Sequence, residues 1–221
     1  TDLTNTGSDS REYVPLAEHV NRSLRVKVTY TDAVGTRGYI YSDPVNIYAQ
    51  DSTAPTITNS QVSNDGSKLI LTFSENIFLS PGGAFSSLQV TVDGSSNNPI
   101  TAISRTDGLS PATLTDISDS KIELTLTNKI LSGQQVTLDY LNSTQFIYDS
   151  NNNFLSSVNS QSVTNISNVI GFVNGQAYEG DFHVMDNGMK MTGASHGSGT
   201  DQIIYSTLAE STSSENSTSR L

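Results

Sequence analysis

Two histidines near the C-terminal end carry the strongest potential for chemistry in this 221-residue chain. His183 and His196 stand on either side of an Asp-Asn-Gly sequence at 186–188, which is typical of a tight turn between paired strands. A hairpin there would bring the two imidazoles together, and paired imidazoles bind zinc, nickel or iron. The alternative interpretation is structural, with both histidines hydrogen-bonded at strand ends. Three aspartates are near enough in the sequence to add a third ligand: Asp181, Asp186 and Asp201.

Oxygen-bearing side chains suited to calcium form a second candidate site. Asp149, Asn151 and Asn153 alternate along the chain, as the first ligands of an EF-hand loop do. Phe154 occupies the sixth position, where that loop needs glycine, and no glutamate stands at the twelfth. Because Asn and Asp both tolerate the left-handed conformation, a plain turn without metal is the alternative. Glu75, at the end of a predicted strand, has the same choice between calcium ligand and solvated carboxylate.

Pairs of carboxylates offer a third kind of chemistry, that of the acid and nucleophile of a glycosidase. With no tryptophan and 7% aromatic residues, the chain has little with which to line a sugar cleft. It also contains no Walker, dinucleotide-binding or His-Glu-x-x-His motif. We therefore predict that the protein is not an enzyme, and keep a carbohydrate-active enzyme with accessory sandwiches as an alternative. The carboxylate pairs are Glu179 with Asp181 and Asp116 with Asp119.

Charge and composition exclude several other classes of function. The net charge is −11, from 22 acidic and 11 basic residues, and lysine and arginine form no cluster. Phosphate binding needs a basic surface, so we expect no nucleic-acid partner. No apolar run approaches the roughly 18 residues that span a bilayer, so no membrane insertion is expected. The absence of cysteine rules out disulfides and thiolate metal sites.

The elements that must position these groups show a repeated alternation of apolar and polar side chains, with turn residues between the runs. Such alternation is typical of half-buried β-strands, and short runs at this spacing predict an antiparallel sandwich. In the clearest run, 69–75, Leu69, Leu71 and Phe73 point to one side. Asn-Gly at 174–175 predicts a further hairpin. Other runs of the same kind lie at 25–31, 45–49, 88–92, 122–126 and 136–140.

Several weak motifs occur in a fixed order between residues 54 and 149. They are Ala54-Pro55, Leu69-Ile-Leu-Thr-Phe-Ser-Glu75, Val90-Thr-Val-Asp-Gly94, Leu124-Thr-Leu126, Gly133-Gln-Gln-Val-Thr-Leu-Asp-Tyr140 and Asp149. In this order they resemble the Ig-like repeat of a cyanobacterial swimming-motility surface protein and of many large adhesins. Residues 13–35 look like the second half of such a repeat. The resemblance implies that the first strands of that repeat lie upstream of Thr1 or come from a partner chain.

Residues 50–55 have the composition of a linker, because Pro55 stops any strand from continuing through them. The sequence Asp51-Ser-Thr-Ala-Pro55 resembles the junction between tandem Ig-like domains. In such arrays the junction aspartate often helps to bind calcium and stiffen the joint, so the resemblance implies that Asp51 is a calcium ligand. The alternative is a solvated aspartate in a linker.

Residues 178–196 contain a more unusual motif. Tyr178-Glu-Gly-Asp-Phe-His183 is followed, after the Asp-Asn-Gly turn, by Met191-Thr-Gly-Ala-Ser-His196. This combination resembles a short module of structural and fibre proteins of phages and large DNA viruses, especially marine ones. The chain departs from that module in two places, since His183 lacks the usual His-x-His or His-Pro neighbourhood and no second histidine follows His196 closely.

These patterns together predict an all-β fold of tandem Ig-like antiparallel β-sandwich modules with a small C-terminal β-hairpin module. The tail is low in complexity and rich in serine and threonine, so we expect it to be disordered. The expected domains are a partial Ig-like domain at 1–49, a linker at 50–55, an Ig-like β-sandwich at 56–167, a β-hairpin module at 168–206 and the polar tail at 207–221.

The two resemblances imply a structural role without catalysis. The leading hypothesis is a virion structural protein of a marine phage, a capsid-decorating, neck or tail fibre component that acts in assembly and host attachment at the virion surface. The alternative is a segment of a secreted bacterial adhesin or cell-surface motility protein, stiffened by calcium. The expected partners are further copies of the chain, capsid or tail proteins, and host cell-surface glycans. The expected cofactor is none, or Ca²⁺.

Overall fold

The computed structural model describes residues 14–80, 85–94, 98–105, 119–197 and 201–213 of the chain. The chain divides into two compact units, Thr1–Ser52 and Thr53–Leu221. The boundary between the units falls within the stretch 50–55 that the sequence assigns to a linker. The start of the expected partial domain, 1–13, and the end of the expected tail, 214–221, lie outside the described residues.

The first unit holds two separate two-stranded antiparallel ladders, β1 with β4 and β2 with β3. Of residues 14–52, only His19 is buried. Val26, Val28 and Tyr30 alternate along one face and stay 64%, 49% and 51% exposed. Two isolated ladders build no sandwich, so among residues 14–52 no second sheet covers this apolar face. The elements are η1 (Ala17–His19), β1 (Arg22–Leu24), β2 (Lys27–Thr31), β3 (Arg37–Tyr41) and β4 (Val45–Ile47).

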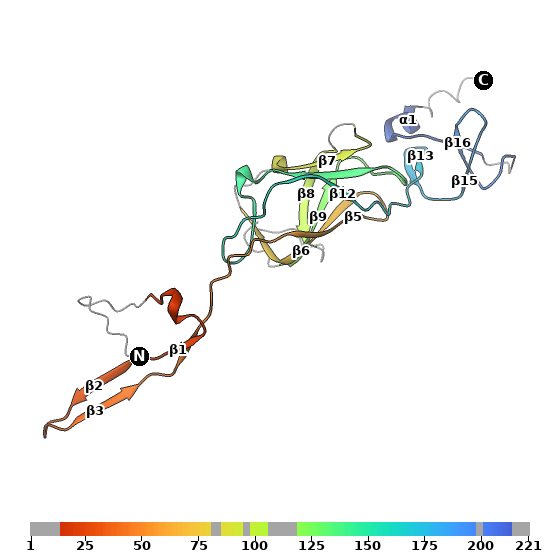
Figure 1. Cartoon of the computed structure of the whole chain (residues 1–221). Coiled ribbons are helices and arrows are strands. Elements are labelled where there is room, and N and C mark those ends of the chain that lie inside the picture. The colour runs from red at the N-terminus through yellow and green to blue at the C-terminus, as the bar shows by residue number, and fades with distance from the viewer. Residues whose placement is uncertain (1–13, 81–84, 95–97, 106–118, 198–200, 214–221) are drawn as a thin grey trace. The chain divides into compact units, whose positions relative to one another are not determined.

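The second unit is built on a sandwich of two antiparallel sheets, whose layers are visible in Figure 1. One sheet has the order β12-β10-β7, and the other has the order β11-β6-β9-β8 with β5 also paired to β6. Two 3-10 turns, η2 (Phe85–Ser87) and η3 (Asn142–Thr144), lie between strands. The strands are β5 (Ile57–Val62), β6 (Lys68–Leu79), β7 (Leu88–Val92), β8 (Ile100–Arg105), β9 (Asp119–Leu126), β10 (Val136–Tyr140), β11 (Ile147–Tyr148) and β12 (Val158–Val163).

The hydrophobic core consists of the apolar side chains that alternate along these strands. Leu69, Leu71 and Phe73 of β6 are all buried. Burial of such side chains from water is the main favourable contribution to folding. The all-β antiparallel fold predicted from the alternation is therefore confirmed. Other strands contribute Leu88, Val90, Ile122, Leu124, Leu126, Val136, Leu138 and Tyr140.

Strand β6 is longer than the sequence indicated. The predicted run ends at Glu75, whereas β6 continues to Leu79. It continues because Ile77 and Leu79 resume the apolar alternation and are fully buried. The pairing with β9 shifts register between Thr72 and Ile77. Glu75 therefore lies inside β6, at the point where the pairing with β9 is irregular, and it is half-buried.

The two sheets are joined along one edge by backbone hydrogen bonds. The N–H of Val62, at the end of β5, donates to the carbonyl of Thr164 over 2.9 Å. The N–H of Thr164 donates in turn to the carbonyl of Ser60, also over 2.9 Å. These bonds satisfy backbone groups that would otherwise form an open sheet edge.

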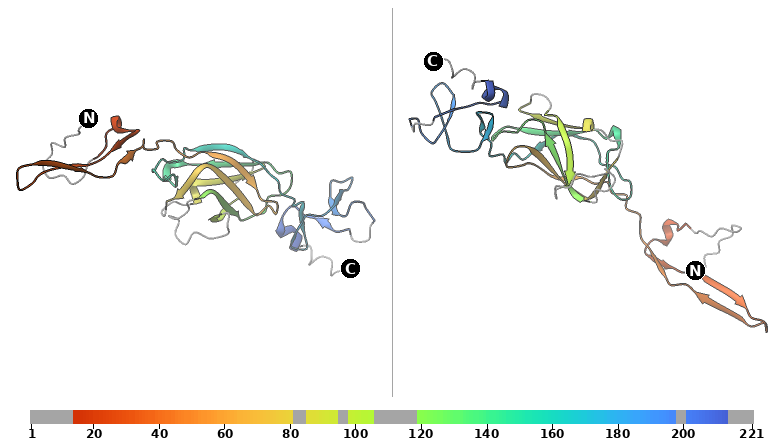
Figure 2. Two further views of the ribbon diagram at one scale, coloured as in Figure 1. Left: turned by 90° about the horizontal axis from the view of Figure 1, so that it is seen from below. Right: turned by 180° about the vertical axis from the view of Figure 1, so that it is seen from behind.

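The C-terminal strands pack against one end of the sandwich (Figure 2). Strands β13 (Gly171–Val173) and β14 (Gln176–Tyr178) form one hairpin, and β15 (Phe182–Val184), β16 (Lys190–Thr192) and β17 (Ile203–Ile204) form a small sheet. Phe172 and Tyr205 exchange two backbone hydrogen bonds of 2.9 Å, which join these two sheets. Leu131 of the sandwich packs with Val169 and Phe172. Both hairpins that the Asn-Gly pairs predicted are confirmed.

A short helix, α1 (Leu208–Ser213), stands in the stretch that the sequence assigned to a polar tail. Thr207 and Glu210 explain it, because they form a reciprocal capping box. Thr207 Oγ1 accepts a 3.2 Å bond from the N–H of Glu210, and Glu210 Oε2 accepts a 3.2 Å bond from the N–H of Thr207. Ser211 Oγ accepts a 3.2 Å bond from the N–H of Gly175, which ties α1 to the β13–β14 hairpin. No helix in the described ranges is long and apolar enough to cross a membrane.

Candidate metal centre

Hairpin β15–β16 and the chain that follows it bring three potential metal ligands together, His183, His196 and Asp201. His183 lies in β15, opposite Met191 of β16. His196 lies in the loop after β16, and Asp201 stands shortly before β17. One potential ligand atom from each of the three residues lies within 4.8 Å of the others. The ring centroids of the two histidines are 5.8 Å apart, so the expected proximity of the imidazoles is confirmed, whereas metal binding itself stays a prediction.

Of the three aspartates that the sequence offered, Asp201 is the one in this group. Its Oδ2 lies 3.1 Å from Nδ1 of His196 and accepts a 2.8 Å hydrogen bond from the N–H of Gly197. The Asp201 side chain is 11% exposed, and that of His196 is 64% exposed. Asp181 and Asp186 are both exposed, and neither belongs to such a group within the described part of the chain. Sequence spacing alone could not choose among the three.

His183 is held from one side of its ring. Its Nδ1 lies 2.9 Å from the carbonyl oxygen of Gly193. Gly193 is itself fixed, because its N–H donates to the carbonyl of Asp181 over 2.8 Å. That same carbonyl accepts a 2.6 Å hydrogen bond from the hydroxyl of Tyr178. The other ring nitrogen, Nε2, is buried and has no hydrogen-bond partner among the described residues.

The carboxylate of Asp149 closes the loop that follows β11. Its Oδ1 accepts 2.8 Å hydrogen bonds from the N–H groups of Asn151 and Asn153, and its Oδ2 accepts one from the side-chain amide of Asn153. Burial raises the pKa of Asp149, but these hydrogen bonds outweigh burial and lower it. Asn152 takes the left-handed conformation, with φ of 63°. This is the hydrogen bonding of a turn that needs no metal, and calcium at Asp149, Asn151 and Asn153 stays a prediction.

A second carboxylate lies near this loop. An oxygen of Glu75 is within 4.8 Å of one of Asp149, so two acidic side chains from β6 and the loop meet there. Two carboxylates at such a spacing attract a cation. Asp51, the residue that the resemblance marks as a calcium ligand, is exposed and belongs to the first unit. Its part in calcium binding stays a prediction.

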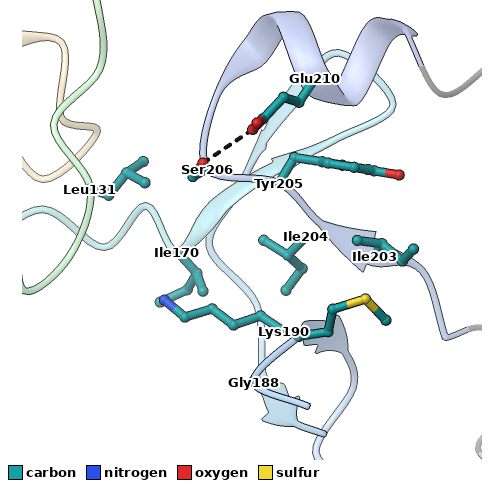
Figure 3. A pocket seen from close by; sticks show the side chains of 10 residues that line it. Leu131, Ile170, Gly188, Lys190, Ile203, Ile204, Tyr205, Ser206 and Glu210 are labelled. Carbon is teal, nitrogen blue, oxygen red and sulfur yellow. Dashed lines mark hydrogen bonds between the residues drawn. The ribbon is translucent and has the colours of Figure 1, made fainter.

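An open pocket of about 420 Å³ lies between the C-terminal strands and α1 (Figure 3). Its lining is mainly apolar, with Lys190 and Glu210 as its charged members. Glu210 Oε2 accepts a 3.1 Å hydrogen bond from the hydroxyl of Ser206. The hydrogen bonds from Thr207 and Ser206 lower the pKa of Glu210. Glu210 is thus engaged in capping α1, and the pocket brings together no acid and base within hydrogen-bonding distance of each other.

The carboxylate pairs considered for glycoside hydrolysis gain no support from the described residues. Glu179 and Asp181 are exposed, and neither lines the pocket. Asp116, a member of the other pair, lies outside the described residues.

The Thr-x-x-Glu sequence at 207–210 is the signal that sequence reasoning missed, since it marks the start of a helix beside the pocket.

Residues 50–145 match the family model described as "Putative flagellar system-associated repeat". The match begins in the expected linker and covers β5 to β10. This supports the resemblance to the Ig-like repeat of swimming-motility proteins. In the structure the sandwich continues through β11 and β12, so the folded domain extends past the matched residues.

Other comparisons add less. No curated protein matches the chain. Among solved structures, the crystal structure of the N-terminal part of the bacterial S-layer protein SbsC has a TM-score of 0.37 and 11% sequence identity, over 70% of this chain and 38% of that one. The chain therefore spans well under half of that structure. The resemblance of residues 178–196 to a virion module finds no support in the comparisons.

Proposed function

We propose that this chain is a non-catalytic structural part of a bacterial protein displayed outside the cell, in an assembly that serves motility or adhesion. The observation that carries the proposal is the match of residues 50–145 to the flagellar system-associated repeat. The matched strands form the sandwich itself, so the similarity concerns the framework of the second unit. A disulfide-free sandwich with an acidic surface is a suitable building block for a repeated surface structure.

The first unit supports a role in assembly. Its β2–β3 ladder exposes apolar side chains on more than one strand, among them Val28 and Tyr30 of β2 and Tyr39 and Ile40 of β3. Exposed apolar surface of this kind marks an interaction site. We propose that a second copy of the chain covers this ladder, since a repeated surface structure places equivalent units next to one another.

The virion role was inferred mainly from residues 178–196, together with the incomplete first domain and the polar tail. The family match covers a different and longer part of the chain and favours the bacterial surface. A virion would place the protein in particles released from the host, whereas a surface protein stays with the cell envelope or its secreted appendages. The two roles therefore differ in where the full-length protein is found.

Surface labelling of intact cells tests the proposal. Antibodies raised against the full chain should label unbroken cells, and brief protease treatment of those cells should remove the signal while a cytoplasmic control protein survives. The same antibodies should detect nothing in purified phage particles from the same culture. Signal confined to particles, or to the interior of lysed cells, would overturn the proposal.

A further inference from the structure

We propose that His183, His196 and Asp201 bind one divalent transition-metal ion, with Zn²⁺ as the best fit. This goes beyond a structural role at the cell surface and does not depend on it. The three side chains come from β15, from the loop after β16 and from the residues before β17. A metal ion at this position would connect all three segments of the small sheet.

The hydrogen bonding of His183 prepares it as a ligand. The carbonyl oxygen of Gly193 can only accept, so the 2.9 Å contact requires the proton to be on Nδ1 of His183. In the neutral ring, Nε2 then carries an unshared electron pair. A histidine that donates one N–H to a backbone carbonyl and presents its other nitrogen is the usual arrangement of a zinc ligand.

If His183 had only a structural role, the burial of its Nε2 atom would have no explanation. This nitrogen is shielded from solvent and meets no donor or acceptor among the described residues. Buried polar atoms are nearly always satisfied, because an unpaired one costs folding free energy. A metal ion coordinated to Nε2 removes that cost, and the imidazole of His196, with its ring centroid 5.8 Å from that of His183, is near enough to offer a second ligand.

The ligand set favours zinc over calcium or magnesium. Imidazole nitrogen suits zinc, copper, nickel and iron, whereas calcium and magnesium prefer an all-oxygen shell. Two imidazoles and one carboxylate are three of the four ligands of a tetrahedral zinc ion, and the fourth position takes a water molecule. The potential ligand atoms, within 4.8 Å of one another, must close further around the ion. His196 can make that movement because its side chain is 64% exposed.

Cobalt spectroscopy on the full-length, untagged chain tests the site. The metal-free protein titrated with Co²⁺ near neutral pH should bind one ion per chain and develop the intense visible bands of four-coordinate cobalt. Added Zn²⁺ should displace the cobalt and bleach those bands. His183→Gln, His196→Gln and Asp201→Asn should each weaken binding by at least roughly tenfold.

The chain supplies its own controls. Asp181→Asn and Asp186→Asn make the same charge change on exposed aspartates of the same region and should leave the affinity unchanged. His19→Gln removes the third histidine of the chain, which lies in the first unit, and should have no effect. If His183→Gln fails to fold, the metal affinity of His196→Gln tests the site, because His196 is exposed and its replacement should not disturb folding.

Three results would overturn the proposal. One is the absence of cobalt bands when Co²⁺ is in excess over the chain. Another is a loss of affinity with Asp181→Asn as large as that with Asp201→Asn. The third is unchanged binding in a folded His196→Gln variant, which would place the metal elsewhere in the chain.

Discussion

Asn153 donates two hydrogen bonds of 2.8 Å to the carboxylate of Asp149, one from its backbone N–H and one from its side-chain amide. The backbone N–H of Asn151 donates a third hydrogen bond to the same carboxylate. The side chain of Asp149 is fully buried and holds the loop 149–153 together. Beside the loop, Tyr148 and Phe154 form a β-bridge and place their rings 5.7 Å apart. Asp149 thus fastens the connection between β11 and β12 to the sandwich.

Replacing Asp149 should destabilise the second unit. In Asp149→Ala the backbone N–H groups of Asn151 and Asn153 lose a charged acceptor, and we expect a loss of about 3 kcal/mol in the free energy of unfolding. Asp149→Asn keeps the shape and one acceptor oxygen, so its loss should be smaller. Urea denaturation of the full chain measures both, with the exposed Asp186→Ala as the control. Equal stabilities of Asp149→Ala and that control would contradict the assigned role.

The same carboxylate makes stability depend on pH. The hydrogen bonds that outweigh burial lower the folded-state pKa of Asp149 below its ordinary value of 3.8. A group with a lowered pKa stabilises the fold above the unfolded-state value, and this stability disappears as the pH falls through the folded-state value. The difference in stability between wild type and Asp149→Asn should therefore shrink as the pH is lowered from about 6 to below 3.8.

Asp65 adds to this dependence on acid. Burial raises the pKa of Asp65, but hydrogen bonds from Ser63 and Ser67 and the charge of Lys129 lower it well below its ordinary range. The Asp149→Asn variant should still lose stability at low pH because of Asp65. An Asp65→Asn variant should remove this second part of the pH dependence. Denaturation curves collected over the same pH range compare the two, and an identical pH profile in wild type and both variants would contradict these roles.

Much of the fold follows from local patterns in the sequence. Alternation along 69–75 fixes which side chains of β6 enter the core, and the Asn-Gly pairs fix two hairpins because residues such as Asn174 adopt a positive φ there, in this case 48°. The continuation of β6 to Leu79 was missed because Glu75 interrupts the pattern at a register shift. The polar composition of the tail concealed α1, whose capping depends on only two side chains, Thr207 and Glu210.

The candidate site was only partly accessible from the sequence. The turn at 186–188 predicted a hairpin between the two histidines, and that hairpin forms, but it pairs His183 with Met191. His196 approaches His183 only through the loop that follows β16. The choice of Asp201 depends on the path of the loop between β16 and β17, which no periodicity encodes. The acceptor role of Gly193 and the burial of His183 Nε2 also depend on that path, so they emerge only from the folded chain.

The capping box of α1 gives a local prediction. Thr207→Ala removes the oxygen that accepts the N–H of Glu210, and loss of such a cap costs about 1 kcal/mol. The helix should then exchange its amide hydrogens faster at 208–213, while the strands of the sandwich keep their protection. Thr207→Ser, which keeps the accepting hydroxyl, serves as the control. Equal exchange in the two variants would show that the cap does not hold the helix.

Calcium binding by Asp51, which the sequence predicts, can be tested directly. If the resemblance to tandem Ig-like junctions holds, calcium should raise the melting temperature of the metal-free chain. For a dissociation constant of roughly 10⁻⁴ M, which is usual for extracellular modules, about 10 mM Ca²⁺ adds close to 3 kcal/mol. Asp51→Asn should abolish most of this gain and the exposed Asp43→Asn should not. A gain that survives in Asp51→Asn would instead favour calcium at the Glu75 and Asp149 carboxylates, and no gain at all would contradict calcium binding by Asp51.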